Sequence, residues 1–170
     1  VEVRLVGSDG RDRDDEGELW VRSPGLMRRY LNLDEATRAR MGDGWDRSGD
    51  VVRRDEDGFH YFVSRADDML VCGGENVYPA EVEALLERHG EVAQAAVVAI
   101  ADEIKGQLPV AFVVRRPGAA VAEEDLKRFA LANAPAYQHP RRVWFVDELP
   151  LAGTKKVDRA ALVARAAEAS

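Results

Sequence analysis

The alternation of hydrophobic and polar residues predicts a first part of the chain that is built mostly from strands. Valine and arginine alternate over residues 1–6, as expected of a strand with one buried face. Residues 7–17 are polar, acidic and contain glycine, and are therefore predicted to form a loop. The further elements predicted here are a strand at 18–22, a short helix capped by Asn32 and running to Met41, and a hairpin of 51–54 and 59–63 around the turn 55–58.

From about residue 67 onward, strands are interleaved with amphipathic helices. The most hydrophobic stretch, residues 92–101, has the composition of a core strand. This part is predicted to contain a strand at 69–72, a helix at 79–89 that ends at Gly90, strands at 92–101 and 108–115, a helix at 122–133, a strand at 142–146 and a helix at 158–167. The sequence therefore predicts an α+β fold, with a boundary near Asp67 between a β-rich beginning and a compact unit of about 100 residues.

Composition narrows the classes of function. Of the 170 residues 46% are apolar and 32% are charged, enough for a buried core and a soluble surface. The formal net charge of −7 argues against a nucleic-acid partner, because phosphate binding needs a basic stripe. No apolar run has the length that spans a bilayer, and residues 1–4 lack the apolar region of a signal peptide. The lone cysteine, Cys72, excludes an internal disulfide and predicts a cytoplasmic location.

Residues 64–83 contain the densest group of candidate functional residues. The charged residues Arg65, Asp67 and Asp68 precede a short apolar strand. The adjacent glycines Gly73 and Gly74 follow, and a proline then opens a helix. Adjacent glycines permit positive φ angles and a close approach of the backbone. Taken alone, the pattern is equally typical of turns in proteins that bind no ligand.

Three separate segments resemble motifs of the acyl-adenylate-forming enzymes, in the same order and with compatible spacing. Residues 44–50, Gly-Trp-Asp-Arg-Ser-Gly-Asp, resemble G-W-x-x-T-G-D. Residues 64–83 resemble the segment that ends in G-G-E-N-V-Y-P-x-E-V-E. Residues 150–159, Pro-Leu-Ala-Gly-Thr-Lys-Lys-Val-Asp-Arg, resemble P-x-T-x-x-G-K-x-x-R. The second segment is most similar to fatty-acid and aryl-acid CoA ligases.

The resemblance implies the C-terminal portion of an acyl-CoA ligase. Family members carry a large N-terminal domain with a Ser/Thr/Gly-rich phosphate loop, which does not occur in this sequence. Residues 1–66 would be the last β-rich part of that domain, and residues 67–170 a mobile C-terminal lid domain. The implied reaction joins a carboxylic acid to ATP as acyl-AMP, and CoA then displaces AMP; the implied cofactors are ATP, Mg²⁺ and CoA. The 170 residues alone are expected to be inactive.

Lys156 is the candidate catalytic residue that the resemblance implies. It stands three residues before Arg159, as the third motif requires. A lysine can place a point charge near both the carboxylate and the α-phosphate. Lys155 occupies the place of the motif's glycine, which is expected to stiffen the loop and leaves the choice between the two lysines open. The alternative is that the two lysines form a solvated surface pair.

The resemblance assigns nucleotide binding to Asp50 and Arg65. The carboxylate of Asp50 would accept hydrogen bonds from the ribose hydroxyls of AMP, and Arg65 would donate to the same ribose. The alternatives are a turn-capping aspartate after Gly49, and a structural salt bridge from Arg65 to Asp67 or Asp68.

The resemblance also implies a hinge residue, and four residues that serve the second step, the transfer of the acyl group to CoA. Asp67 matches the residue about which the small domain of the family rotates. Gly73 and Gly74 would border the passage for the pantetheine of CoA, although an ordinary tight turn explains them nearly as well. Arg141 and Arg142 are candidates for contacts with the CoA phosphates, or are exposed residues at a strand edge.

Other kinds of chemistry are not indicated. His60, His89 and His139 lack the spacing of metal ligands, and His89 suits the C-terminus of a helix. Cys72 has no neighbouring base in the sequence and is predicted to be packed. The three tryptophans, Trp20, Trp45 and Trp144, are interpreted as packing residues.

Two other functions fit the same residues. The first is an adenylating enzyme that transfers its acyl group to a carrier protein rather than to CoA. The second is a stand-alone module without catalytic activity that binds a partner. In the leading interpretation the partners are a small carboxylic acid, ATP and CoA, with neither nucleic acid nor a membrane span. Fatty, aromatic and short dicarboxylic acids are all compatible with it.

Overall fold

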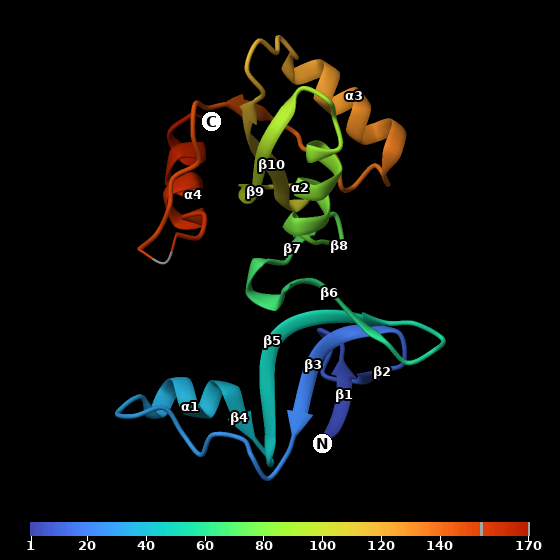
Figure 1. The fold of residues 1–170 in the computed structure, drawn as a ribbon, viewed down its shortest axis with the longest axis vertical. Coiled ribbons are helices and arrows are strands. Elements are labelled where there is room, and N and C mark those ends of the chain that lie inside the picture. The colour runs from blue at the N-terminus through green and yellow to red at the C-terminus, as the bar shows by residue number, and fades with distance from the viewer. Residues whose placement is uncertain (154, 170) are drawn as a thin grey trace. The chain divides into compact units, whose positions relative to one another are not determined.

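The computed structural model describes residues 1–153 and 155–169. The chain divides into two compact units, unit 1 over Val1–Asp67 and unit 2 over Asp68–Ser170 (Figure 1). The sequence places this boundary one residue earlier. Both units contain strands, and the α+β class predicted from the sequence is confirmed. No helix in the described part of the chain has the length and apolar character needed to cross a membrane.

Unit 1 is a six-stranded antiparallel sheet with one short helix. The strands follow the order β2-β1-β3-β5-β4, and β6 pairs with the free length of β5. Their bounds are β1 Glu2–Val6, β2 Asp12–Arg13, β3 Glu16–Arg22, β4 Met41–Gly42, β5 Trp45–Arg54 and β6 His60–Arg65, with the helix α1 at Asp34–Arg40. The predicted hairpin around residues 55–58 is the β5–β6 connection.

One local prediction for unit 1 is wrong. Asn32 does not cap α1, because the N-cap residue is Leu33 and no side chain caps this helix. Asn32 instead adopts a φ of 56°, a left-handed conformation that asparagine tolerates in turns. Residues 45–50, which contain most of the first motif, form the first half of the long strand β5.

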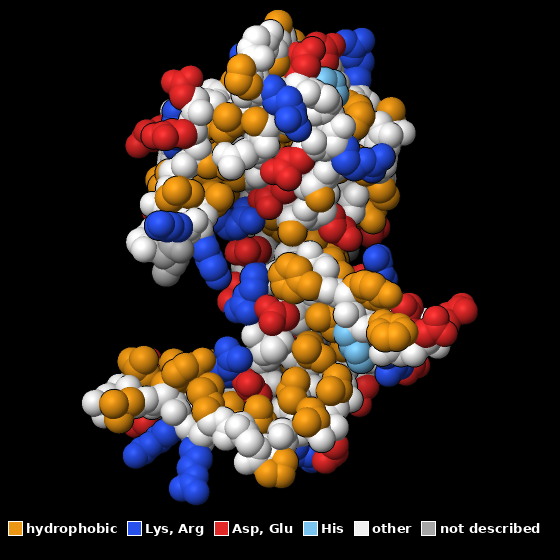
Figure 2. Space-filling view, viewed as in Figure 1, with side chains coloured by type: hydrophobic (Ala, Val, Ile, Leu, Met, Phe, Trp, Pro, Cys, Tyr) orange, Lys and Arg blue, Asp and Glu red, His pale blue; other side chains and the backbone are white. Residues whose placement is uncertain are grey.

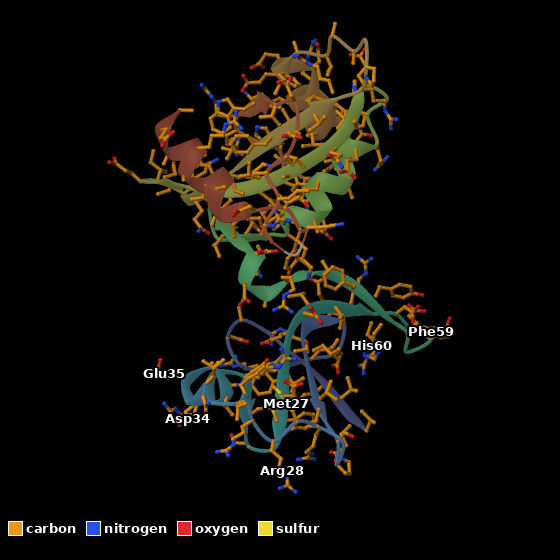
Figure 3. The ribbon with its side chains drawn as sticks, turned by 60° about the vertical axis from the view of Figure 1, so that its left-hand side comes forward. Met27, Arg28, Asp34, Glu35, Phe59 and His60 are labelled. Carbon is orange, nitrogen blue, oxygen red and sulfur yellow. The ribbon has the colours of Figure 1, made fainter. Side chains whose placement is uncertain are left out.

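Unit 1 leaves several large apolar side chains at its surface. Its described buried apolar residues are Leu5, Val6, Val51, Val52 and Val63. By contrast Phe59 and Phe62 are 65% and 63% exposed, and Tyr61 is half exposed. Phe59 and His60 lie at the end of the β5–β6 hairpin (Figure 3), and apolar and acidic side chains share the surface of this region (Figure 2). The helix α1 has no buried residue.

Unit 2 is a five-stranded sheet with helices on both faces. Its strands follow the order β11-β10-β7-β8, and β9 pairs with β10 over almost its whole length. The pairing of β10 with β11 is parallel, and the others are antiparallel. The bounds are β7 Leu70–Cys72, β8 Glu75–Val77, β9 Val92–Asp102, β10 Gly106–Arg115, β11 Val143–Phe145, α2 Pro79–Glu87, α3 Glu123–Asn133 and α4 Arg159–Glu168.

The two long strands of unit 2, β9 and β10, bury side chains on both faces. Val92, Ala95 and Val97 of β9 belong to one core, and Ala96 and Val98 belong to a second. The first core also contains residues of α2 and α3, and the second contains Leu162 and Ala166 of α4. Figure 1 shows α2 and α4 on opposite sides of β9 and β10. Burial on both faces explains why residues 92–101 form an almost continuous apolar run.

The helix ends of unit 2 differ in detail from the predictions. The helix α2 begins at Pro79 and ends at Glu87, and its C-cap Arg88 is right-handed. Gly90 therefore supplies no left-handed C-cap. Asp158 caps α4, because its carboxylate accepts a hydrogen bond from the backbone N–H of Ala161 at 3.0 Å.

Candidate functional site

Asp50, the second aspartate of the first motif, lies beside an irregularity in β5. In the pairing of β3 with β5, Glu18 lies opposite Val51 and Trp20 lies opposite Arg47. The three residues 48–50 therefore face a single residue of β3, as at a β-bulge. Bulges bend a strand and change the direction of a side chain, and they are common beside active sites. The irregularity at Ser48, Gly49 and Asp50 therefore changes the direction of the Asp50 side chain relative to a regular strand.

Glu18 stabilises this irregular backbone. One carboxylate oxygen of Glu18 accepts a hydrogen bond from the backbone N–H of Gly49 at 3.1 Å. The other oxygen accepts a bond from the indole N–H of Trp20 at 2.9 Å. Glu18 lies 31 residues from Gly49 in the sequence, and the sequence analysis did not identify it. A carboxylate spaced two residues before a tryptophan on a strand was the only local signal.

Asp50 and Arg65 form an ion pair across neighbouring strands. They lie opposite each other in the register of β5 and β6, and Nη1 of Arg65 donates to Oδ1 of Asp50 at 2.8 Å. Nη1 also donates to the backbone carbonyl of Ser48 at 3.1 Å, and Nη2 donates to Asp67 at 3.4 Å. The hydrogen bond to Asp50 raises the pKa of Arg65, although burial opposes it. The side chains are 42% and 38% exposed, so a ligand can reach the pair.

Gly49 is required for this arrangement. Its φ is +73°, a conformation that L side chains rarely adopt. A Cβ at this position would lie 2.6 Å from Nη2 of Arg65, so the guanidinium occupies the space that a side chain would fill. The structure therefore brings Asp50 and Arg65 together. Of the alternatives considered, the turn-capping role of Asp50 is wrong because Asp50 lies within β5, and Arg65 pairs with Asp67 but not with Asp68.

The expected hinge residue lies in a short 3₁₀ helix, Ala66–Asp68, at the boundary of the two units. The side chain of Asp67 is 83% exposed and makes a single weak contact with Arg65. Asp68, the next residue, belongs to unit 2 and forms an ion pair with Arg159 at 3.4 Å. The chain therefore passes from one unit to the other within this turn.

Lys156 lies in a loop that a small antiparallel bridge closes. Leu151 and Val157 pair, the backbone N–H of Ala152 donates to the carbonyl of Lys156 at 2.8 Å, and that of Asp158 donates to the carbonyl of Pro150 at 2.8 Å. Both lysines of the loop are exposed. Among residues 1–153 and 155–169, no group forms a hydrogen bond or an ion pair with the ammonium of Lys156, which is available to a ligand.

Lys155 has the backbone conformation of the glycine that it replaces in the motif. Its φ is +60°, in the left-handed region that favours glycine. Non-glycine residues in this region cost about 1–2 kcal/mol. The sequence analysis expected a stiffer loop at Lys155, and the structure adds a strained conformation. Thr154, the preceding residue, lies outside the described residues.

Gly73 and Gly74 form the two-residue turn of the β7–β8 hairpin. Cys72 pairs with Glu75, and both glycines have positive φ angles, +62° and +89°. A two-residue hairpin turn with two positive φ angles selects glycine by itself. No atom of the described chain lies within 4 Å of a Cβ placed on Gly74, and the Lys105 side chain lies 4.0 Å from one on Gly73. The hairpin was missed in the sequence, because β8 is only three residues long.

Arg141 and Arg142 point to different neighbours. Nη1 of Arg141 lies 2.8 Å from Nε2 of His139, and its Nε is buried without a partner in the described chain. Burial acts to raise the pKa of Glu123, but the hydrogen bonds from Lys127 and from the backbone N–H of Val143 outweigh it, and the pKa is lowered. The positive charges of Lys127 and Arg142 add to this lowering, so Arg142 lies near Glu123. The two arginines therefore do not form one joint cationic site.

The remaining candidates are packing residues. Trp20 and Trp45 lie against arginine side chains, with the guanidinium of Arg4 4.6 Å from each ring centre. Trp144 stacks on Phe112, and Cys72 is buried. Among the described residues no cluster of three His, Cys, Asp or Glu side chains could hold a metal ion. This part of the chain therefore offers no ready site for Mg²⁺.

Comparison with known proteins places these features in a family. Residues 81–156 match the family model of the AMP-binding enzyme C-terminal domain. The chain is 44% identical over 143 residues to a 2-succinylbenzoate–CoA ligase of Geobacillus sp. (strain WCH70). The matched region makes up 84% of this chain and 29% of the relative. The chain thus spans about 30% of the length of the curated relatives that it matches.

Solved structures agree with this match. The amide bond synthetase McbA from Marinactinospora thermotolerans aligns with a TM-score of 0.88 and 34% identity, over 96% of this chain and 34% of that one. The O-succinylbenzoate coenzyme A synthetase MenE from Bacillus subtilis, in complex with AMP, aligns with a TM-score of 0.83 and 32% identity, over 95% and 33%. The resemblance inferred from the three motifs is thereby confirmed. Residues 81–156 are thus similar to the C-terminal domain of the AMP-binding enzymes.

Proposed function

We propose that the protein containing this chain is an ATP-dependent carboxylic acid–CoA ligase that forms an acyl-adenylate intermediate. The observation that carries the proposal is the accessible ion pair of Asp50 and Arg65, held by the glycine and strand irregularity of the first motif. Its support from outside the chain is the similarity to ligases named for CoA thioester formation. The expected cytoplasmic location is part of the same proposal.

In the first step a carboxylate oxygen of the acid attacks the α-phosphorus of ATP, and the bond to pyrophosphate breaks. Arg65 already donates to Oδ1 of Asp50. The other carboxylate oxygen has no hydrogen bond within the described residues, so it can accept from a ribose hydroxyl. The exposed ammonium of Lys156 offsets the charge that develops as the two anions meet. Mg²⁺ would accompany the phosphates of ATP and supply positive charge to them.

In the second step the sulfur of CoA attacks the acyl carbonyl, and AMP leaves with the bonding electrons. Rotation about Asp67 would exchange the Lys156 loop for the Gly73–Gly74 turn, where open space beside Gly74 leaves room for pantetheine. Lys105, whose side chain lies beside Gly73, and Arg141 are candidate partners for the CoA phosphates. Arg142 lies toward Glu123 and is the weaker candidate.

One observation favours a different acceptor. McbA, a neighbour with a TM-score of 0.88, is named for amide bond synthesis. The acceptor of the second step is therefore tested with CoA, a carrier-protein thiol and an amine in parallel. Formation of the CoA thioester alone would support the ligase. Transfer only to a carrier protein or an amine would replace it.

The experiment for the first step is acid-dependent exchange of pyrophosphate into ATP by the intact protein. The panel starts with 2-succinylbenzoate, for which the relatives are named, and continues with aromatic, fatty and short dicarboxylic acids. Asp50→Asn is expected to raise the KM for ATP about 10- to 100-fold, the cost of a lost hydrogen bond to a charged group. The exposed Asp57→Asn, on the β5–β6 turn, is the control. The proposal would be refuted if none of the acids supported pyrophosphate exchange, or if Asp50→Asn and Asp57→Asn had equal KM values for ATP.

A further inference from the structure

Arg159 is the most fully paired cation of unit 2. Its Nη1 donates to Oε1 of Glu83 at 2.7 Å and to the backbone carbonyl of Val97 at 2.7 Å. Its Nη2 donates to Oε2 of Glu83 at 3.2 Å, and its Nε lies 3.4 Å from Oδ2 of Asp68. A bidentate pair with further partners fixes a guanidinium in both position and orientation.

The partners of Arg159 are themselves held by the sheet. Glu83 also accepts a hydrogen bond from the backbone N–H of Val97 at 2.8 Å, so it joins α2 to the edge strand β9. Its side chain is only 16% exposed, and that of Arg159 is 29% exposed. Burial opposes the charge on Arg159, but the hydrogen bonds that it donates to Glu83 and the charges of Glu83 and Asp68 prevail and raise its pKa.

The position of Arg159 in the chain links two functional segments. Arg159 is the first residue of α4, and Asp158 before it closes the base of the Lys156 loop by donating to the carbonyl of Pro150. At the other end of the network, Asp68 directly follows the hinge residue Asp67. Asp68 and Arg159 are far apart in the sequence, yet one ion pair joins them within unit 2.

We infer that Arg159 is a positioning residue: through Asp68 and Glu83 it ties the base of the Lys156 loop to the segment that follows the hinge. The inference rests on the proposed function, in which Lys156 acts in the first step and Asp67 is the hinge. The tie lets a rotation at Asp67 place the lysine loop as one body with β9 and α2. The Gly73–Gly74 turn does not need it, because β7 follows the hinge directly in the chain.

The test replaces Asp68 by asparagine in the intact protein, which removes one charge and leaves the Glu83 pair intact. The expected result is a kcat for pyrophosphate exchange about 10- to 100-fold lower, as for a small misplacement of a catalytic group. The KM for ATP, the melting temperature and the rate of thioester formation from supplied acyl-adenylate stay unchanged. Asp68→Glu restores most of the exchange rate. The control is Glu124→Gln, which removes a carboxylate from an exposed ion pair on α3 and changes none of these quantities.

Hydrogen–deuterium exchange tests the tie without relying on activity. In Asp68→Asn the backbone amides of Ala152 and Asp158, which are hydrogen-bonded in the loop, should exchange faster than in the wild type. Unchanged exchange there, or equal losses in both half-reactions together with a lower melting temperature, would overturn the inference. A wild type without pyrophosphate exchange, or a fully active Lys156→Ala, would refute the proposed function instead, and amide exchange would still decide the inference. Arg159→Lys, which keeps the charge but loses the fork, is expected to reproduce both effects in weaker form.

Discussion

The two units of this protein bury their side chains in different ways. In unit 2, successive residues of β9 and β10 alternate between two cores, and α2, α3 and α4 cover both faces of the sheet. In unit 1 the buried apolar residues are few, α1 buries nothing, and Phe59 and Phe62 stay exposed on the β5–β6 hairpin. Since buried apolar area supplies most of the stability of a domain, unit 2 should be the more stable of the two.

The proposed functional groups of the two units differ in the same way. Unit 1 holds Asp50 and Arg65 on paired strands, where each side chain fixes the other. Unit 2 presents Lys156 on an exposed loop that backbone hydrogen bonds close, and its ammonium has no ionic partner in the described chain. A preformed pair suits a nucleotide that is bound in both steps. A free ammonium on a supported loop suits a group that must enter and leave.

The largest effect is expected from Phe112→Ala in unit 2. Phe112 is 1% exposed and stacks on Trp144, so its loss should reduce the free energy of unfolding by about 3–5 kcal/mol. Urea unfolding followed by residue-resolved hydrogen exchange separates the two units. The exchange of unit 1 amides should not change. If Phe112→Ala destabilised both units equally, the conclusion that unit 1 and unit 2 have separate hydrophobic cores would be wrong.

The next effect concerns the ion pair of unit 1. Gly49→Ala and Gly58→Ala both place a side chain at a positive φ, +73° and +85°, and each should cost about 1–2 kcal/mol of stability. Only Gly49→Ala meets Arg65, whereas Gly58 has open space around it. Gly49→Ala alone should therefore weaken ATP binding, by about 10-fold or more. Calorimetric titration with ATP measures the difference, and equal affinities in the two variants would remove the role assigned to the pair.

A smaller effect is expected in the Lys156 loop. Lys155→Gly relieves the left-handed conformation and should stabilise unit 2 by about 1 kcal/mol or less, since glycine also adds freedom to the unfolded chain. Lys155→Ala keeps the Cβ and should give no gain. Thermal unfolding of both variants against the wild type checks this, and a gain in the alanine variant would show that strain is not the cause.

The smallest effect is a dependence of stability on pH in unit 2. Burial lowers the pKa of His139 below 6.5, and Arg141, Lys105 and Lys127 add to this against the hydrogen bond with Ala136. The unfolded chain therefore binds the proton more tightly. Stability should fall as the pH drops through 6.5 toward the lower pKa of the folded state. His139→Gln should flatten the urea midpoint of unit 2 over that interval, and an unchanged slope would contradict the assignment.

The sequence predicted most elements of unit 2 because their pattern is local and strong. The apolar run of β9 and the amphipathic period of α3, with Leu126 and Ala130 buried, could be identified directly. The short strand β8 and the irregularity in β5 could not, since each depends on the strand that pairs with it. The motifs indicated Asp50, Arg65 and Lys156 by resemblance.

The supporting residues of the site escaped the sequence analysis for a different reason. Glu18 and Gly49 are 31 residues apart, and Arg159 and Glu83 are 76 residues apart. Such pairs are set by the tertiary fold, and no periodicity or turn rule contains them. Arg159 was noted only as a spacing marker for Lys156, although its guanidinium pairs with Glu83 and Asp68, both far from it in the sequence.

The most direct test of the account compares Lys156→Ala with Lys155→Ala in the intact protein, measuring each half-reaction alone. The account predicts that Lys156→Ala lowers acid-dependent pyrophosphate exchange by about 100-fold or more, the typical cost of losing one group that stabilises developing charge. It should leave thioester formation from supplied acyl-adenylate unchanged, and Lys155→Ala should leave both steps near the wild-type rate. Retained exchange in Lys156→Ala, or an equal loss in both of its steps, would contradict the assignment of this lysine to the first step alone.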